Sequence, residues 1–234
     1  MVRHYALHCR HRQHRPRPVT APRTESDRID AARRRPGVLF IVSAPSGAGK
    51  TSLVHALCKA DAQVEVSVSY TTRAPRPGEE PGRHYHFVTR AQFEQMLERG
   101  ELLESALVHG NFYGTSEPWV RSQLAAGASI VLEIDWQGAA QVRRRFPDSI
   151  GVFVLPPSIA ALEQRLRLRG QDAAEVIAAR LQAAREEIAH ACEYDYVMIN
   201  DDFATAVQDL CAIVRAARLR TALQLSVQSG PTQN

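Results

Sequence analysis

The feature that most constrains this chain is an apolar run that leads directly into a glycine-rich loop and then into a helix-like segment. Val38–Val42 is entirely apolar, as expected for a strand buried on both faces of a sheet. Ser43–Ser52 follows with the letters SAPSGAGKTS, and Leu53–Lys59 has helical character. Backbone N–H groups in such a unit converge on an anion, and the helix N-terminus adds partial positive charge. The unit therefore predicts a cradle for nucleotide phosphates.

The residue types in this loop suit the same chemistry. Gly47 and Gly49 let the backbone approach phosphate oxygens that a Cβ would block. Lys50 can reach the outer phosphates, and the Thr51 hydroxyl can ligate Mg²⁺. Because glycine, proline and serine also build ordinary turns, the flanking strand and helix are what favour phosphate binding. The strict G-x-x-x-x-G-K-[ST] pattern would have glycine at position 44. The predicted nucleotide-binding residues are Ala44, Pro45, Ser46, Gly47, Ala48, Gly49, Lys50 and Thr51.

Strands and helices alternate along the rest of the chain. Buried apolar strands are predicted at 129–135, which ends in Glu133 and Asp135, and at 151–155 and 196–199. A half-exposed strand is predicted at 64–69 and a short one at 84–88. The predicted helices span 91–99, 118–126, 158–170, 172–192 and 204–223, and Asp172 with Glu175 has capping-box spacing. Apolar strands joined by helical crossovers predict an α/β fold with a parallel sheet flanked by helices, whose ligands bind beyond the carboxyl ends of the strands.

The first 36 residues differ from the rest in composition. Ten arginines and three acids give residues 1–35 a formal charge of +7, against +4 for the whole chain, so the remainder carries −3. With little apolar periodicity, residues 1–36 are predicted to form a disordered extension. Three origins stay open: a start assigned too far upstream, a mitochondrial-type presequence, and non-specific attraction to nucleic acid or anionic surfaces. Residues 221–234 are expected to form a C-terminal tail, with the last ten residues polar and frayed.

The cysteines and the hydropathy of the sequence indicate the expected compartment and membrane association of the protein. The four cysteines, Cys9, Cys58, Cys192 and Cys211, form no C-x-x-C pair, and the last three are predicted on apolar helical faces. This usage is typical of reduced thiols and favours a cytoplasmic protein. No apolar run approaches the ~20 residues that a membrane-spanning helix needs, so no membrane partner is expected.

A second unusual segment, residues 67–79, reads SVSYTTRAPRPGE and places Arg73 and Arg76 in one polar loop. Planar guanidinium groups could hold a phosphate there, although a solvated basic loop has the same composition. Further motifs follow in order: G-x-x-Y-x-F-V at 82–88, GNFYGT at 110–115, DWQG at 135–138 and NDD at 200–202. With the phosphate loop, these motifs resemble the guanylate kinase family from about residue 37 to residue 220. The resemblance is strongest to the bacterial enzymes, whose phosphate loop also tends to have alanine at the position of Ala44.

The resemblance implies a function and an organisation. It implies transfer of the γ-phosphoryl group of ATP to GMP or dGMP with Mg²⁺, giving ADP and GDP, as a step in purine nucleotide metabolism. It implies a P-loop NTPase core over residues 37–220, an inserted GMP-binding region at about 69–114 and a helical lid at about 158–185. The implied partners are these small molecules, with no specific nucleic acid, and a homo-oligomer is possible.

The family's motifs also assign roles to residues of the acceptor site. Glu104 and Asp135 would accept the N–H donors of guanine, and the hydroxyls of Ser69 and Thr115 would donate to its O6. Four residues match those that hold the GMP phosphate in the family: Arg73, Arg76, Tyr85 and Tyr113.

On the donor side, Asn200 and Asp201 match the adenine end of the ATP site. Glu133 stands where the family usually has aspartate, close to the magnesium waters, and its longer side chain could shift the metal geometry. The residues expected to act on the transferring phosphoryl group are Lys50, Arg73, Arg169 and Arg180, the last two from the lid.

Two other functions stay open. Guanylate-kinase-like domains also serve as peptide-binding modules in scaffolding proteins, but these usually have a degraded phosphate loop, whereas Lys50 and Thr51 are present here. A kinase for another nucleoside monophosphate is the second alternative. The acids and hydroxyls argue against AMP, because adenine reverses donor and acceptor at the six position.

Overall fold

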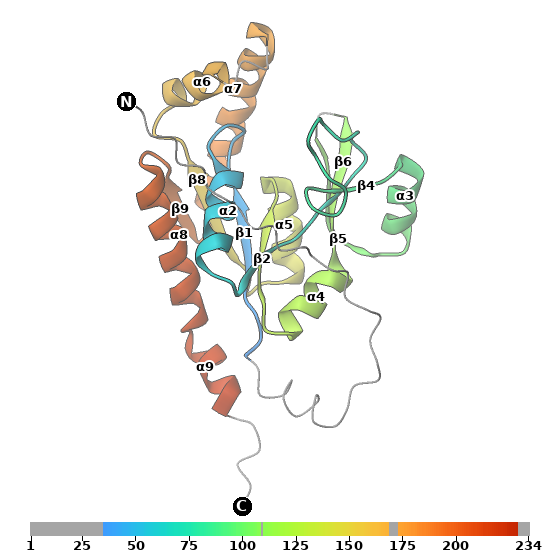
Figure 1. Ribbon diagram of the computed structural model, residues 1–234, viewed down its shortest axis with the longest axis vertical. Coiled ribbons are helices and arrows are strands. Elements are labelled where there is room, and N and C mark those ends of the chain that lie inside the picture. Colours follow the sequence, from blue (N-terminus) through green and yellow to red (C-terminus); the bar gives the residue numbers. More distant parts are fainter. Residues whose placement is uncertain (1–34, 109, 169–172, 229–234) are drawn as a thin grey trace, which may run out of the picture.

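A five-stranded parallel sheet forms the centre of the molecule (Figure 1). The computed structural model describes residues 35–108, 110–168 and 173–228. The strand order is β2 (Val64–Val66), β7 (Ser129–Glu133), β1 (Leu39–Ser43), β8 (Ile150–Leu155) and β9 (Tyr196–Ile199). Every neighbouring pair is parallel. The strand that leads into the glycine-rich loop is therefore the central one, and the predicted α/β fold with a parallel sheet is confirmed.

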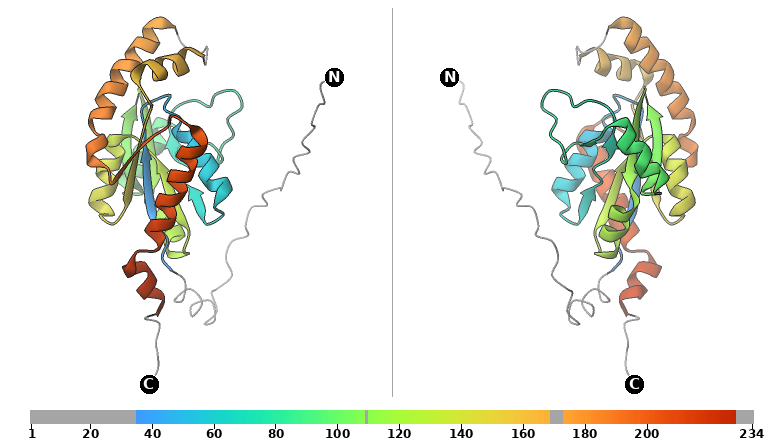
Figure 2. Two further views of the ribbon diagram at one scale, coloured as in Figure 1. Left: turned by 90° about the vertical axis from the view of Figure 1, so that its left-hand side faces the viewer. Right: turned by 90° about the vertical axis from the view of Figure 1, so that its right-hand side faces the viewer.

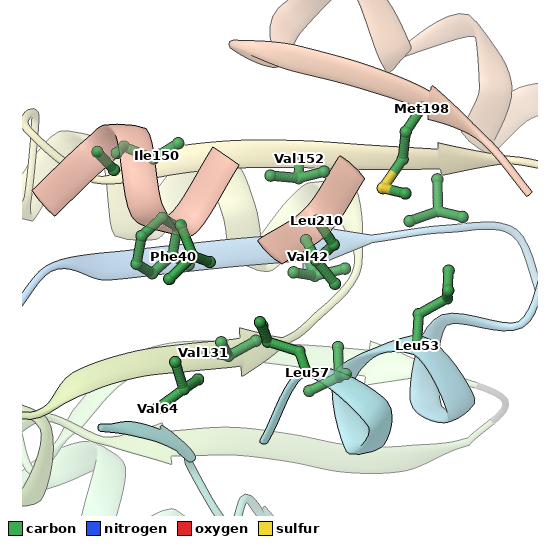
Figure 3. Close-up of a cluster of buried hydrophobic side chains, with 14 of the residues drawn as sticks. Phe40, Val42, Leu53, Leu57, Val64, Val131, Ile150, Val152, Met198 and Leu210 are labelled. Atoms are coloured by element: carbon green, nitrogen blue, oxygen red, sulfur yellow. The ribbon is translucent and has the colours of Figure 1, made fainter. Parts of the chain in front are cut away.

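Alternate residues of β1 face two separate cores, one on each side of the sheet. Phe40 and Val42 lie in the core beneath α2 and α8 (Figure 3). Leu39 and Ile41 lie in the opposite core, beneath α4 and α5. Because helices cover both faces, an apolar residue at every position is favourable, and burying each such side chain stabilises the fold by about 1.5–3 kcal/mol. The four helices are α2 (Lys50–Ala60), α4 (Glu117–Ala125), α5 (Trp136–Arg145) and α8 (Phe203–Arg218).

A second, four-stranded sheet lies beside the first (Figure 1). Its order is β4 (His86–Phe87), β3 (Tyr70–Thr71), β6 (Asn111–Ser116) and β5 (Leu102–Val108). Helix α3 (Arg90–Glu98) packs against it through a small core. Strands β5 and β6 were not predicted from the sequence. A register shift between Leu102 and Glu104 interrupts the period-two pattern that reveals a half-buried strand.

Helices α6 (Ile159–Leu168) and α7 (Ala174–Ala189) pack against each other through leucine, isoleucine and alanine side chains. In Figures 1 and 2 this pair extends beyond the carboxyl ends of the sheet strands, next to the loop that follows β1. Ser158 caps α6 as predicted, because its Oγ accepts a hydrogen bond from Ala161 N–H at 3.0 Å. Helix α7 begins with Ala173 as its N-cap. Asp172, which was predicted to cap this helix, lies outside the described residues.

Several other sequence predictions are corrected by the structure. Strand β9 is an edge strand with only Met198 buried, because β8 alone pairs with it in the described chain. The predicted helix over 204–223 is two helices, α8 and α9 (Thr221–Gln228), which break at Leu219 and Arg220. Cys192 is exposed and lies in a short 3-10 helix, Ala191–Glu193, and not on an apolar face.

The remaining differences concern boundaries and coverage. Helix α5 was not predicted, and β2 ends at Val66, three residues before the predicted end. No helix in the described segments is long and apolar enough to cross a membrane. The predictions for residues 1–34, for Cys9 and for the last six residues concern parts of the chain outside the described residues.

Candidate nucleotide-binding site

A cleft of about 400 Å³ lies at the carboxyl ends of β1 and β7, where the sheet faces its smaller neighbour. Three parts of the fold supply its walls: the loop after β1, the second sheet with its connections, and the last turn of α7. Residues predicted from separate motifs meet here although they are far apart in sequence. The predicted site residues that line the cleft are Ala44, Pro45, Ser46, Gly47, Gly49, Lys50, Thr51, Ser69, Arg73, Arg76, Tyr85, Glu104, Tyr113, Glu133 and Asp135.

The loop after β1 has the backbone of an anion cradle. Gly47 and Gly49 adopt φ of +95° and +96°, a region that side chains with a Cβ rarely enter. Gly49 is also the N-cap of α2, so the first N–H groups of that helix open onto the loop. The side-chain amide of Asn200 donates to the Ala48 carbonyl at 2.7 Å. A Cβ on Gly49 would lie 2.4 Å from that amide, so glycine is required for this support as well.

Asn200 and Asp201 therefore differ in position. Asn200 is buried and supports the phosphate loop from behind, whereas Asp201 is exposed beyond the end of β9. The Asn200 carbonyl accepts a hydrogen bond from Arg165 Nη2 at 2.8 Å, which joins α6 to the same corner. Neither Asn200 nor Asp201 lines the cleft.

Acidic side chains surround Lys50, the first residue of α2. Burial lowers the pKa of Lys50, and the negative charges of the nearby acids oppose that shift. Thr51, the next residue, donates its hydroxyl hydrogen to Glu133 Oε2 at 2.8 Å. A hydroxyl oxygen and a carboxylate thus lie together beside the loop. The acids that act on Lys50 are Glu133, Asp135, Glu187 and Glu104.

On the opposite wall, Glu104 is a buried acid with only 4% of its surface exposed. It projects from β5 and accepts a hydrogen bond from the Thr115 hydroxyl of β6 at 2.7 Å. Burial raises its pKa to about 7. Gly138 leaves room for the carboxylate, because a Cβ there would lie 2.8 Å from Glu104 Oε2. Thr115 is fully buried and reaches the cleft only through Glu104.

Asp135 serves the fold and the cleft together. Its Oδ1 accepts a hydrogen bond from Gly138 N–H at 2.9 Å and so caps the start of α5. Asp135 follows β7 closely, while Glu104 comes from the second sheet. The two sheets therefore each contribute one carboxylate to this end of the cleft.

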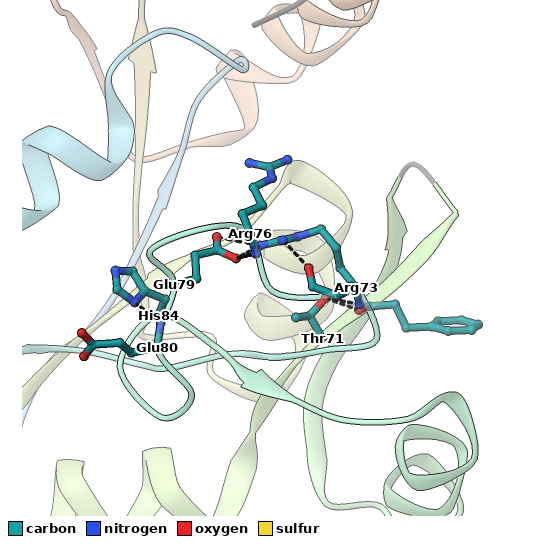
Figure 4. Close-up of polar contacts among 8 residues, drawn as sticks. Thr71, Arg73, Arg76, Glu79, Glu80 and His84 are labelled. Carbon is teal, nitrogen blue, oxygen red and sulfur yellow. Dashed lines mark hydrogen bonds and ion pairs between the residues drawn. The ribbon is translucent and has the colours of Figure 1, made fainter.

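The loop after β3 brings two arginines to the second-sheet wall (Figure 4). Arg73 Nη2 contacts both carboxylate oxygens of Glu79, at 2.8 and 2.9 Å, and Nη1 donates to the Ala74 carbonyl at 2.7 Å. The Arg73 guanidinium lies 5.4 Å from the Tyr85 ring centre. Tyr85 meets Tyr113 edge to face at 5.9 Å, and burial raises the pKa of Tyr85. Guanidinium and phenol donors thus gather at one place, as oxyanion recognition requires.

Only one of the two predicted lid arginines belongs to the described residues. Arg169 lies outside the described residues. Arg180 is half-buried on α7 and is not among the residues that line the cleft.

Sequence reasoning missed two acids that do line the cleft, Glu79 and Glu187. Glu79 ends the arginine motif, but no pattern indicates that its side chain turns back onto Arg73. Glu187 comes from the last turn of α7, where the neighbouring His190 stacks on Trp136 at 3.7 Å between ring centres. Burial and the charge of Asp135 raise the pKa of Glu187 to about 7. Only the tertiary packing of α7 on α5 brings this acid to the cleft.

A glycine-rich loop at the end of a central parallel strand, with lysine and threonine opening the next helix, defines the class of P-loop nucleotide-binding proteins. Comparison with known families narrows that class. The family model for guanylate kinase matches residues 36–217, and this chain belongs to that family.

Known guanylate kinases are similar to this chain over most of its length. The guanylate kinase of Methylobacillus flagellatus is 61% identical over 189 residues, which cover 81% of this chain and 94% of that protein. The guanylate kinase of Thiobacillus denitrificans is 60% identical over 190 residues, 81% of this chain and 91% of the relative. The crystal structure of guanylate kinase from Anaplasma phagocytophilum aligns with a TM-score of 0.69 at 32% identity, over 86% of this chain and 99% of that one.

Proposed function

We propose that this chain transfers the γ-phosphoryl group of ATP to GMP, giving ADP and GDP. The observation that carries the proposal is the position of Glu104, a buried acid on the wall opposite a phosphate loop. The family membership and the relatives named guanylate kinase at about 60% identity support it. We expect dGMP to be accepted as well, because the base and the phosphate are the same in both nucleotides.

The chemistry of the acids fits guanine. Its Watson–Crick edge offers N–H donors at N1 and N2, and an ionised carboxylate can only accept. Glu104 and Asp135 would take those donors, while Ser69 would supply a hydroxyl donor to O6. Thr115, predicted for the same role, gives its one hydroxyl hydrogen to Glu104 and would act by holding that carboxylate. Adenine would place an acceptor against the carboxylates and leave buried polar groups unpaired, which rejects the wrong base strongly.

The phosphate of GMP would lie against Arg73, Arg76, Tyr85 and Tyr113. A phosphate oxygen of GMP attacks the γ-phosphorus, and the bond from that phosphorus to the oxygen shared with the β-phosphate breaks, so no protein nucleophile is needed. Lys50 and the phosphate loop would stabilise the charge on the transferring group. We assign the same role to Arg169 and Arg180, which closure of the α6–α7 pair would bring over the phosphates, excluding water from the reaction. Asn200 and Asp201 would border the adenine end.

The residues beside the loop fit a magnesium ion. Thr51 Oγ1 and Glu133 Oε2 are hard oxygen donors 2.8 Å apart next to the phosphate cradle, and Mg²⁺ prefers such oxygens. We propose that these two residues hold the ion directly or through water. When bound with ATP, it would neutralise negative charge on the phosphates.

A coupled assay for ADP formation with GMP, AMP, CMP and UMP as acceptors tests the function. We expect turnover with GMP far above that with the other three. Equal rates with all four would refute guanine selection, and a complete lack of turnover would favour the binding-module alternative. Assays with and without Mg²⁺ test the metal in the same experiment.

A further inference from the structure

The loop after β3 contains a turn that fixes a carboxylate in place (Figure 4). Glu79 N–H donates to the Arg76 carbonyl at 3.0 Å, and Gly78 adopts φ of +85° after Pro77, as a tight turn requires. The Glu79 side chain then turns back, and its Oε2 accepts a hydrogen bond from Arg76 N–H at 2.7 Å. The turn thus determines where the Glu79 carboxylate lies, independently of any contact that this carboxylate makes with Arg73.

That carboxylate determines where Arg73 lies. Both its oxygens contact Arg73 Nη2, and the side chains of Arg73 and Glu79 are 14% and 17% exposed. The Ala74 carbonyl holds Nη1, and the rings of Tyr85 and Phe87 lie 5.4 and 5.8 Å from the guanidinium carbon. A free arginine side chain samples many rotamers, and these contacts restrict that freedom before a ligand binds.

We propose that Glu79 is a positioning residue that holds the Arg73 guanidinium ready for the phosphate of the acceptor nucleotide. The proposal rests on the proposed function, since it takes a nucleoside monophosphate as the ligand of this wall. A guanidinium has five N–H donors, more than Glu79, Ala74 and Tyr113 occupy, so donor capacity remains for a phosphate. Preorganisation of this kind strengthens binding because the ligand does not have to order the side chain itself.

The alternative to positioning is that Glu79 competes with the phosphate for Arg73. A carboxylate at an anion site could instead occupy the place of the phosphate and compete with it. The structure favours positioning, because Glu79 is fixed by its own turn through Arg76 N–H and would stay there when a phosphate arrives. The two roles predict opposite effects when the charge of Glu79 is removed.

The test compares Glu79→Gln with Glu80→Gln. Glu80 is the adjacent acid, but it is exposed and pairs with the exposed Arg83 at 3.2 Å. We expect Glu79→Gln to raise the KM for GMP about tenfold, the loss typical of a hydrogen bond to a charged group, and to leave the KM for ATP unchanged. Guanosine, which lacks the phosphate, should bind both variants and the unmodified chain equally in calorimetry. Glu80→Gln should change nothing.

The Arg73→Ala background completes the test. There the Glu79 carboxylate has lost the group it positions and only repels the phosphate, so adding Glu79→Gln should leave the KM for GMP unchanged or lower it. A lower KM for GMP in Glu79→Gln alone would overturn the proposal in favour of competition. An equal loss in both backgrounds would also overturn it, because the effect would then not act through Arg73. Failure of the proposed function is distinguishable, since the unmodified chain would then not phosphorylate GMP.

Discussion

One wall of the cleft presents backbone groups and the other presents side chains. The phosphate-loop wall, Ala44–Thr51, is eight consecutive residues whose N–H groups and two left-handed glycines make the cradle. The second-sheet wall takes Arg73, Glu104 and Tyr113 from three separate elements. A backbone cradle recognises phosphate in any nucleotide, whereas side chains on strands can read one base. The general part of recognition is therefore local in sequence, and the selective part is assembled by the fold.

The largest expected effect tests the phosphate-loop wall. Lys50→Ala should lower kcat by a factor on the order of a thousand while calorimetry finds GMP affinity nearly unchanged, because the lysine acts on the donor phosphates. Lys59→Ala, at the other end of α2, is the matched control and should leave kcat unchanged. A near-normal kcat in the Lys50→Ala variant would contradict the role assigned to Lys50.

The next effect tests the second-sheet wall. Glu104→Gln keeps the shape of the side chain but presents an amide N–H₂ donor where guanine offers donors. We expect the KM for GMP to rise about a hundredfold or more, as for other sites that leave buried polar groups unpaired, while ATP affinity stays the same. If calorimetry showed unchanged GMP affinity, Glu104 would not be a base-reading acid. The exposed pair partner of Arg90, Glu94, provides a neutral comparison as Glu94→Gln.

A smaller effect follows from the ionisation of the same acid. Burial raises the pKa of Glu104 to about 7, so the carboxylate gains a proton as the pH falls through 7 and then offers fewer acceptors. The KM for GMP should therefore be constant above about pH 8 and rise up to about tenfold per unit below pH 7. The GMP phosphate also gains a proton near pH 6, and Glu104→Gln isolates that contribution because it has no carboxyl to titrate. Identical pH profiles for the two proteins would remove Glu104 as the cause.

The smallest effect concerns the acid that α7 adds to the cleft. Glu187→Gln removes a negative charge that faces Lys50, so the KM for ATP should fall about threefold, since the phosphates meet less repulsion. Glu186→Gln is the control, because Glu186 is exposed on the same turn. A rise in KM, or equal changes in both variants, would show that the charge of Glu187 does not act on the donor site.

The phosphate-loop wall could be predicted from the sequence more fully than the second-sheet wall. The central strand, the phosphate loop and α2 were predictable because they are contiguous and their apolar and glycine positions have local causes. Glu104 was found only through the family motif, since its strand carries a register shift that hides the period-two pattern. Glu187 had no local signal, because the Trp136–His190 stack that places it joins residues 54 positions apart. The prediction that β9 is a buried strand was wrong for a related reason. An apolar sequence does not reveal that a strand lies at the edge of a sheet.

Two hydrogen bonds of Asn200 connect parts of the molecule that are far apart in sequence. Its side-chain amide supports Ala48 in the phosphate loop, and its carbonyl holds Arg165 of α6, so one residue joins the floor of the cradle to the outlying helix pair. Asn200 N–H also donates to the carbonyl of Leu155 in β8 at 2.8 Å, so the sheet fixes the residue that makes both contacts. A displacement of α6 would therefore reach the phosphate loop through a single residue.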